Sequence, residues 1–211
     1  MSEWLPIFAL PAFAPDEETS VVAAFKKIPA LVFEQRWRQT PSAGLRPGHV
    51  KVGWRENALW ALAEMEDEDI YNLADGHNQS TWELGDVFEV FAQRQGETGY
   101  IEVHVTPENY RLHLRFPDET AIRQVRAGEQ RHADYFDDPD SLLSNTWVHR
   151  QENFWRALMR MPFVVSPGEA WRLSFCRYDA THGAEPVAAS ISPHTVADFH
   201  RPSEWRLFLQ E

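Results

Sequence analysis

Two successive segments of the chain, residues 100–106 and 110–116, alternate apolar and polar side chains with a period of two. Residues 107–109, Pro-Glu-Asn, lie between them and are typical of a turn. Because successive side chains of a strand point to opposite faces, the pattern predicts two antiparallel strands with one buried and one solvated face. This strand pair limits the fold to classes that are built on half-buried sheets.

The same pattern predicts strands over most of the chain after Gly48. Besides these two, the predicted strands are residues 49–54, 58–65, 86–93, 147–150, 153–163, 171–178 and 205–209. Residues 55–57 are predicted to form a tight turn, and the polar residues 117–145 a long excursion with little regular structure. Many short strands with regular turn signals favour an all-β fold, an antiparallel β-sandwich of the immunoglobulin-like or jelly-roll type.

The N-terminal segment, residues 1–47, is rich in proline and is predicted to be irregular and partly helical. Residues 17–28 can form a short helix that has Asp16 as its N-cap and ends at Pro29. We expect residues 1–211 to form a single domain, in which this segment packs on a β-sandwich of residues 48–211. The length of the chain suits one such domain.

The first 14 residues do not have the pattern of a secretory signal, which needs a basic start and an unbroken apolar centre. The start carries Glu3 without Lys or Arg, and two prolines interrupt the apolar run. No stretch of the sequence is apolar for long enough to cross a membrane. We therefore expect a cytoplasmic protein.

Charge and cysteine content exclude several kinds of partner and site. The formal net charge is -12 and no run of Lys or Arg is present, which argues against nucleic acid and anionic membranes as partners. Cys176 is the only cysteine, so the chain can form neither an internal disulfide nor a cysteine cluster for a metal, and we expect this residue to be buried. The 9 Trp and 13 Phe suit either strands or flat ligand-binding surfaces.

Five short segments, taken in their order along the chain, carry a resemblance to a known family. They are residues 58–67, an apolar strand and acidic turn; 82–91, with Trp, Gly-Asp, Glu and Phe; 100–107; 161–163 with 171–177; and 192–193 with 199–202 and 207–209. Their order resembles family 9 of the carbohydrate-binding modules, β-sandwich modules that are often attached to xylanases. The wider DOMON-like superfamily shares this sandwich and includes domains that bind haem, so the fold alone does not decide the function.

The resemblance implies a sugar site in which two Trp side chains clamp the ligand. Trp82 matches the first of them, and Glu89 and Arg111 match a carboxylate and an arginine that contact the sugar. The second Trp of the family comes from a loop that is Ser-Ile-Ser-Pro at residues 190–193 here, so the second wall is either missing or supplied by another aromatic. Residues 82–89 are one residue longer than the family pattern, which indicates a bulge or a shifted register.

Each of these residues also has a purely structural interpretation. Trp82 can stack on a sugar or close the end of the core. Asp86 and Glu89 are three apart in a strand and point to opposite faces, so they cannot form a facing catalytic pair, and one of them is expected to accept bonds from loop backbone or an arginine. Glu89 can contact a ligand or pair with an arginine such as Arg177.

Two further sets of polar residues have the same two interpretations. Arg111 is predicted to lie on one polar face with its strand neighbours His113 and Arg115 and with Glu102 and His104 of the adjacent strand, a face that either binds a ligand or is solvated. In a separate loop, a histidine near the C-terminus, His200, is expected to tie the last loop to the sheet through its ring nitrogens.

The leading hypothesis is therefore a non-catalytic carbohydrate-binding domain that uses Trp82, Glu89 and Arg111. A haem-binding electron-transfer domain of the same superfamily is the first alternative, with axial ligands such as Met65, His104 or His200. A protein-interaction module that has lost the sugar site is the second. The sequence has no catalytic motif, although a glycosidase needs only two carboxylates that face one cleft.

Some members of the family bind calcium, and the acidic loop at residues 66–69 holds two candidate ligands. These are Asp67 and Asp69, which a hard cation such as calcium can use. The loop lacks the spacing of a complete calcium motif, so a solvated acidic turn is the other interpretation. No cofactor follows from the sequence.

Overall fold

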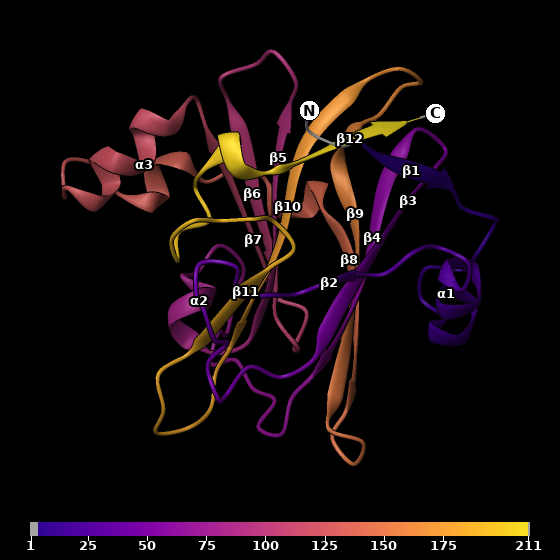
Figure 1. The fold of residues 1–211 in the computed structure, drawn as a ribbon, viewed down its shortest axis with the longest axis horizontal. Coiled ribbons are helices and arrows are strands. Elements are labelled where there is room, and N and C mark those ends of the chain that lie inside the picture. Colours follow the sequence, from indigo (N-terminus) through magenta and orange to yellow (C-terminus); the bar gives the residue numbers. More distant parts are fainter. Residues whose placement is uncertain (1–3, 211) are drawn as a thin grey trace.

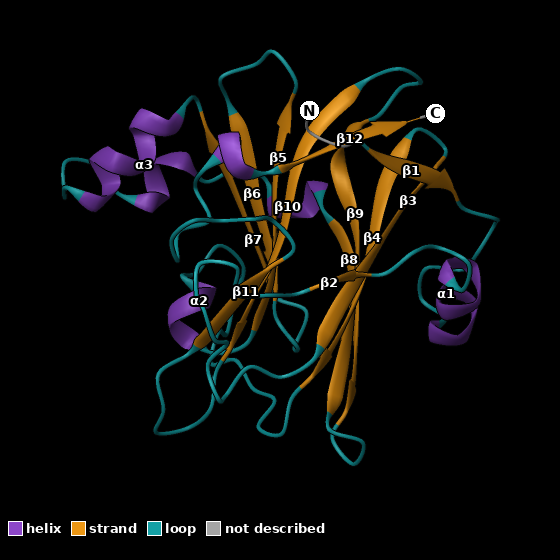
Figure 2. Ribbon diagram, viewed as in Figure 1, coloured by secondary structure: helices purple, strands orange, loops and turns teal. Residues whose placement is uncertain are grey.

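The computed structural model describes residues 4–210 of the chain, and its regular elements are mostly strands (Figure 1; Figure 2). The strands are β1 (Leu5–Ala9), β2 (Leu31–Val32), β3 (Gly48–Arg55), β4 (Ala58–Glu66), β5 (Val87–Arg94), β6 (Tyr100–Val105), β7 (Arg111–Phe116), β8 (Leu143–His149), β9 (Phe154–Val164), β10 (Ala170–Asp179), β11 (Val187–Ser190) and β12 (Arg206–Gln210). The helices are α1 (Glu18–Phe25), α2 (Thr81–Leu84) and α3 (Glu119–Arg126), with short 3₁₀ helices at His132–Tyr135, Pro139–Ser141 and Pro202–Glu204.

The strands form one curled sheet in the order β7-β6-β5-β10-β12-β1-β3-β4-β9-β8, with β11 beside β10 and β2 beside β3. Strand β1 joins the two halves of this sheet. Its first residues pair in parallel with β12 and its last two, Phe8 and Ala9, pair in parallel with β3. The sheet is therefore mixed, and the prediction of a purely antiparallel arrangement is wrong at β1.

The main core lies between the inner faces of the two halves. One half contributes alternate residues of β5, β6 and β10, such as Phe88, Val103 and Phe175, and the other contributes alternate residues of β3, β4 and β9, such as Val50 and Leu59. Figure 1 shows the two halves facing each other, close together near β12 and β1 and further apart at the other end. The period of two in the sequence places these residues on one face.

Two smaller cores lie on the outer faces of the sheet. On the outer face of β4, Trp60 and Leu62 pack against Val21 and Phe25 of α1. On the outer face of β5, β6, β7 and β10, an aromatic cluster is covered by α3 and by the segment that precedes β12. The sheet is thus covered on both sides of each half, and the outer cover over β5 and β6 holds the candidate site.

Most predicted strands are confirmed to within one residue at each end, and β8 begins four residues before the predicted start at Trp147. The tight turn at 55–57 is also confirmed. Glu56 and Asn57 both have positive φ, as a two-residue turn between antiparallel strands requires. Cys176 is buried as expected.

Three expectations about the less regular parts are wrong. The segment of residues 1–47 is not merely irregular, because it supplies β1 and β2 to the sheet. Its helix is shorter than predicted, and Glu17 rather than Asp16 is its N-cap residue. The excursion at 117–145 contains α3 and two 3₁₀ helices, and the side chain of Asp118 caps α3 by accepting the backbone N–H groups of Thr120 and Ala121.

The prediction of a solvated face on the strand pair β6–β7 is wrong as well. Every residue of β6 is buried, including Glu102 and His104. The reason is tertiary, because α3 and the loop before β12 cover the face that the alternation leaves polar.

Among the described helices, none is long and apolar enough to span a membrane.

Candidate functional site

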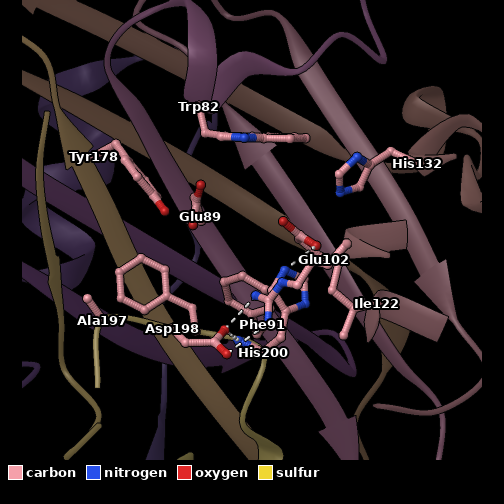
Figure 3. A pocket seen from close by; sticks show the side chains of 12 residues that line it. Trp82, Glu89, Phe91, Glu102, Ile122, His132, Tyr178, Ala197, Asp198 and His200 are labelled. Carbon is pink, nitrogen blue, oxygen red and sulfur yellow. Dashed lines mark hydrogen bonds and ion pairs between the residues drawn. The ribbon is translucent and has the colours of Figure 1, made fainter. Parts of the chain in front are cut away.

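A cavity of about 250 Å³ lies on the outer face of the sheet, beneath the cover just described (Figure 3). Its floor consists of outward-facing side chains of three neighbouring strands: Glu89 and Phe91 of β5, Glu102 of β6 and Tyr178 of β10. Glu89 pairs with His104 across β5 and β6, and with Cys176 across β5 and β10, so these residues share one face. The cavity therefore stands on the polar side of β6.

Trp82 forms one wall of this cavity. Figure 3 shows its indole on one side, Asp198 and His200 on the other, and the carboxyl groups of Glu89 and Glu102 between them. The indole is half-buried and contacts the rings of His104 and His132 edge to face, at centroid distances of 5.8 and 5.0 Å. Of the two interpretations of Trp82, the structure favours an aromatic wall of a cavity.

The short loop around α2 fixes the position of Trp82. The Asn72 side-chain amide donates to the carbonyl oxygens of Thr81 and Asp86 at 2.9 and 3.0 Å. Gly85 follows α2 with φ +147°, and a Cβ atom there would lie 2.4 Å from the Tyr71 carbonyl oxygen, so only glycine fits.

Asp86 and Glu89 lie on opposite sides of the strand, as predicted. Asp86 is the carboxylate that accepts loop backbone bonds, from the N–H groups of Tyr71 and Ala180, both at 2.7 Å. Glu89 does not pair with Arg177. Arg177 lies on the inner face opposite Phe88 and forms an ion pair with Asp179 at 2.9 Å instead. It also donates hydrogen bonds to the carbonyl oxygens of Pro47 and Glu66.

The cavity floor contains a buried chain of polar groups. His104 Nδ1 lies 2.8 Å from the Thr81 hydroxyl, and its Nε2 lies 2.8 Å from Glu102 Oε1 and 3.4 Å from Glu89 Oε1. Burial raises the pKa of Glu89 to about 8, and the charge of Glu102 adds to this effect against the attraction of His104. Burial also opposes ionisation of Glu102, but His200 and His104 together lower the pKa of Glu102. Glu102 is thus the anionic partner of His104, and Glu89 holds its proton near neutral pH.

His200 ties the last loop to the sheet, as predicted. Its Nδ1 lies 2.9 Å from the Tyr100 hydroxyl, and its Nε2 lies 3.6 Å from Glu102 Oε2. The same ring lines the cavity, a position that the sequence did not indicate.

The wall opposite Trp82 comes from the loop that follows Ser192-Pro193, residues 197–200. No tryptophan of the described chain stands there. Instead, Phe199 packs on Phe91 and Tyr178. Asp198 in this loop accepts two hydrogen bonds from the Arg126 guanidinium, at 2.9 and 2.8 Å. Ser190, the first residue of the Ser-Ile-Ser-Pro segment, is fully buried and bonds to Ser174. Its side chain therefore points into the layer that covers the outer face of the sheet.

The excursion between β7 and β8 supplies the remaining wall through Ile122, Arg126 and His132. Sequence reasoning missed these residues because it left the excursion without structure. A signal was present: Asp118 precedes a segment with an acidic first turn and arginines in the last turn, which is typical of a helix start and end.

The prediction that Arg111 shares a face with Glu102 and His104 is wrong. In the register of β6 and β7, Arg111 lies opposite Val105, whereas His104 lies opposite Leu112. The polar side of β7 therefore faces the same way as the apolar side of β6. Arg111 bonds to the carbonyl oxygen of Leu142 and to Asp140 at 3.2 Å, outside the cavity. Segment 137–142 runs along this edge strand and satisfies its polar side chains, which explains the inverted alternation.

The structure does not bring the candidate haem ligands into one cavity. Met65 is fully buried in the main core, on the inner face of the other half of the sheet. Both ring nitrogens of His104 and of His200 lie close to protein groups. The haem alternative thus has no support in the geometry of the described residues.

Three buried carboxylates next to the loop around α2, which positions Trp82, form an arrangement that can hold a metal ion. Oxygen atoms of Asp67, Asp86 and Asp179 lie within 4.8 Å of one another, and Asp67 Oδ2 is buried without a hydrogen-bond partner. Asp179 Oδ2 also lacks a hydrogen bond and is only ion-paired with Arg177, and a set of oxygen donors with such unsatisfied acceptors fits a hard cation such as calcium. Asp69, the second candidate ligand from the sequence, instead accepts bonds from His182.

We expect calcium to reverse a loss of stability with rising pH. Burial and the charge of Asp67 raise the pKa of Asp86 to about 9, against about 3.9 in an unfolded chain. Between these values the folded state retains a proton that the unfolded state releases, so stability is greatest at low pH and decreases as pH rises. In the presence of a chelator, the melting temperature should therefore fall as the pH is raised from about 5 to 8.5. Calcium added at the upper end of this pH range should raise it again. A melting temperature at pH 8 that calcium leaves unchanged would contradict the assignment.

Comparisons with known proteins give a match in structure alone. No family model matches the sequence, and a search of curated proteins finds no match. A protein from Bacteroides uniformis ATCC 8492 to which carbohydrate binding is ascribed superposes with a TM-score of 0.76 at 14% identity, over 100% of both chains. A family 9 carbohydrate-binding module from Caldicellulosiruptor kristjanssonii, solved with cellotriose, superposes with a TM-score of 0.68 at 13% identity, over 99% of this chain and 94% of that one.

The chain has a family 9-like fold. The same module solved with glucose superposes with a TM-score of 0.67 at 13% identity, over 99% of this chain and 96% of that one. The superposition includes the N-terminal strand β1, because nearly the whole chain is covered. The resemblance that the five sequence segments indicated is thereby confirmed at the level of the fold.

Proposed function

We propose that this family 9-like domain is a non-catalytic carbohydrate-binding domain whose site is the cavity beside Trp82. The observation that carries the proposal is the combination of a half-buried indole wall with two carboxyl groups on the floor, Glu89 and Glu102. An aromatic face stacks on the carbon-hydrogen face of a sugar ring, while carboxyl oxygens bind its hydroxyl groups. Arg126, held by Asp198, lines the cavity, and in this proposal it takes the role of the ligand-contacting arginine that the resemblance had assigned to Arg111.

The two structural neighbours that were solved with cellotriose and glucose support a sugar as the class of ligand. We also propose that the two halves of the curled sheet form the layers of a β-sandwich, since the main core lies between them. The proposal is non-catalytic because the structural neighbours are carbohydrate-binding modules.

Isothermal titration against a panel of mono- and oligosaccharides tests the proposal. We expect dissociation constants in the micromolar to millimolar range for at least one member. Quenching or enhancement of tryptophan fluorescence on the same additions should accompany binding, because Trp82 lines the cavity. A panel without any binding at millimolar sugar would overturn the function.

A further inference from the structure

The positive charges at the cavity already have negative partners within the protein. Arg126 is bonded through two nitrogens to Asp198. His104 is bonded to Glu102 at 2.8 Å. Glu89 is the remaining acidic group, and its nearest cation is the same His104 nitrogen at the longer distance of 3.4 Å. The cavity thus contains one carboxyl group more than it has cations to pair.

The floor also contains acceptor atoms that lack donors. Glu102 Oε2 is buried and has no hydrogen-bond partner among the described residues, and Nε2 of His200 lies 3.6 Å away. Glu89 is 2% exposed, and among the described residues its side chain has no hydrogen bond. Buried acceptors without donors are costly, so a ligand that supplies several donors here gains binding energy by satisfying them.

The other titratable groups that face Glu89 do not supply the missing charge. Burial lowers the pKa of His132, on the 3₁₀ helix after α3, and the pKa of His200, on the last loop, so both are neutral at pH 7. On β10, burial raises the pKa of the Tyr178 hydroxyl and of the Cys176 thiol, which keeps both uncharged. An ionised Glu89 therefore needs a cation from outside the protein.

We propose that the ligand of this cavity is an amino sugar whose ammonium group pairs with the carboxylate of Glu89 while its ring stacks on Trp82. An ammonium group supplies three donors and a full positive charge, which matches the unpaired carboxyl group and the orphaned oxygen of Glu102. The cavity of about 250 Å³ has room for a single sugar ring. This inference rests on the proposed sugar-binding function and specifies its ligand.

The proposal carries a characteristic pH dependence. Because burial raises the pKa of Glu89 to about 8, this group must release a proton before it pairs with an ammonium ion. Affinity for an amino sugar should therefore rise about tenfold from pH 6 to pH 7, where the ligand amine is still largely protonated. Affinity for a neutral sugar needs no such ionisation and should stay nearly constant.

Calorimetric titrations with glucosamine, N-acetylglucosamine and glucose at pH 6 and 7 test the inference. We expect glucosamine to bind about tenfold more tightly than glucose at pH 7, and N-acetylglucosamine to show no such advantage. Glu89→Gln keeps the shape and removes the charge, so it should bring the ratio of glucosamine to glucose affinity close to one and abolish the pH dependence. Glu83→Gln, an exposed carboxylate on the helix of Trp82, makes the same change in net charge and should keep the preference.

The outcomes separate this inference from the function on which it rests. Equal binding of glucose and glucosamine by the unaltered protein, or an equal effect of Glu83→Gln and Glu89→Gln, overturns the amino sugar and leaves sugar binding in place. A panel without any binding overturns both.

Discussion

Replacement of Trp82 by alanine should weaken sugar binding at least tenfold. The indole is the flat wall of the cavity, and its loss removes the stacking surface for the ligand ring. Aromatic contacts of this kind contribute about 0.5–1.5 kcal/mol in addition to the apolar area that they bury, so together they should exceed the roughly 1.4 kcal/mol that corresponds to a factor of ten in the dissociation constant. Isothermal titration with the tightest sugar of the panel measures the effect, and Trp82→Phe should give an intermediate value because part of the flat surface remains.

Trp4 provides a matched control for this change. It is 43% exposed, immediately before β1, and does not line the cavity. Trp4→Ala removes the same side chain and should leave the dissociation constant within about twofold of the original. Circular dichroism and melting curves establish that each variant is folded. If Trp82→Ala folds and binds the sugar as tightly as the unaltered protein, the site lies elsewhere.

Replacement of Asp86 by alanine should cost about 3 kcal/mol or more in the free energy of unfolding. Its two carboxylate oxygens accept the backbone N–H groups of Tyr71 and Ala180, at 2.7 Å each. The alanine leaves both donors without a partner in the interior, and each unsatisfied group costs about 1–3 kcal/mol. Urea unfolding curves, analysed for the midpoint and the slope separately, measure the loss.

Two further variants separate hydrogen bonding from charge repulsion at this position. Asp86→Asn keeps one acceptor oxygen and, above about pH 9 where Asp86 itself ionises, removes the charge that faces Asp67, so it should cost less than Asp86→Ala. Asp75→Ala removes an exposed carboxylate from the same loop and should change stability by less than about 0.5 kcal/mol. If relief of the repulsion outweighed the lost hydrogen bonds, both Asp86 variants would be more stable than the original in chelator. That result would reverse our assignment of Asp86 as the residue that fixes this loop.

The strands could be predicted from the sequence because one face of each strand is buried in the main core. This burial gives an alternation of apolar and polar residues that is visible within each short segment. The covering of the outer face could not be predicted in this way. Glu102 and His104 look like residues of a solvated face, and they are buried only because α3 and the loop of Asp198 pack over them from distant parts of the chain. The same limit applies to β1, whose Leu5-Pro-Ile sequence gives no clear strand signal and gains its pairing from β12 and β3.

Some residues of the candidate site could be predicted from the sequence, and others could not. Trp82 and Glu89 could be located because they belong to one short segment that the resemblance covers, and the structure brings both to one cavity. Arg111 could not be placed, because its side depends on the register between β6 and β7, and a shift of one residue exchanges the two faces. Arg126 and His132 come from the excursion, where no sheet periodicity exists to indicate a direction.

The divided pairing of β1 has a consequence for how the chain reaches its native state. Leu5 lies beside Phe208, so the first strand gains one of its two neighbours only when the last strand is available. Contacts between residues so far apart in sequence are entropically costly to form and slow the search for the native structure. During synthesis, the two halves of the sheet can form hairpins of their own, but they are joined edge to edge through β1 only after β12 has been synthesised. The docking of β12 beside β1 should therefore be a late step in folding.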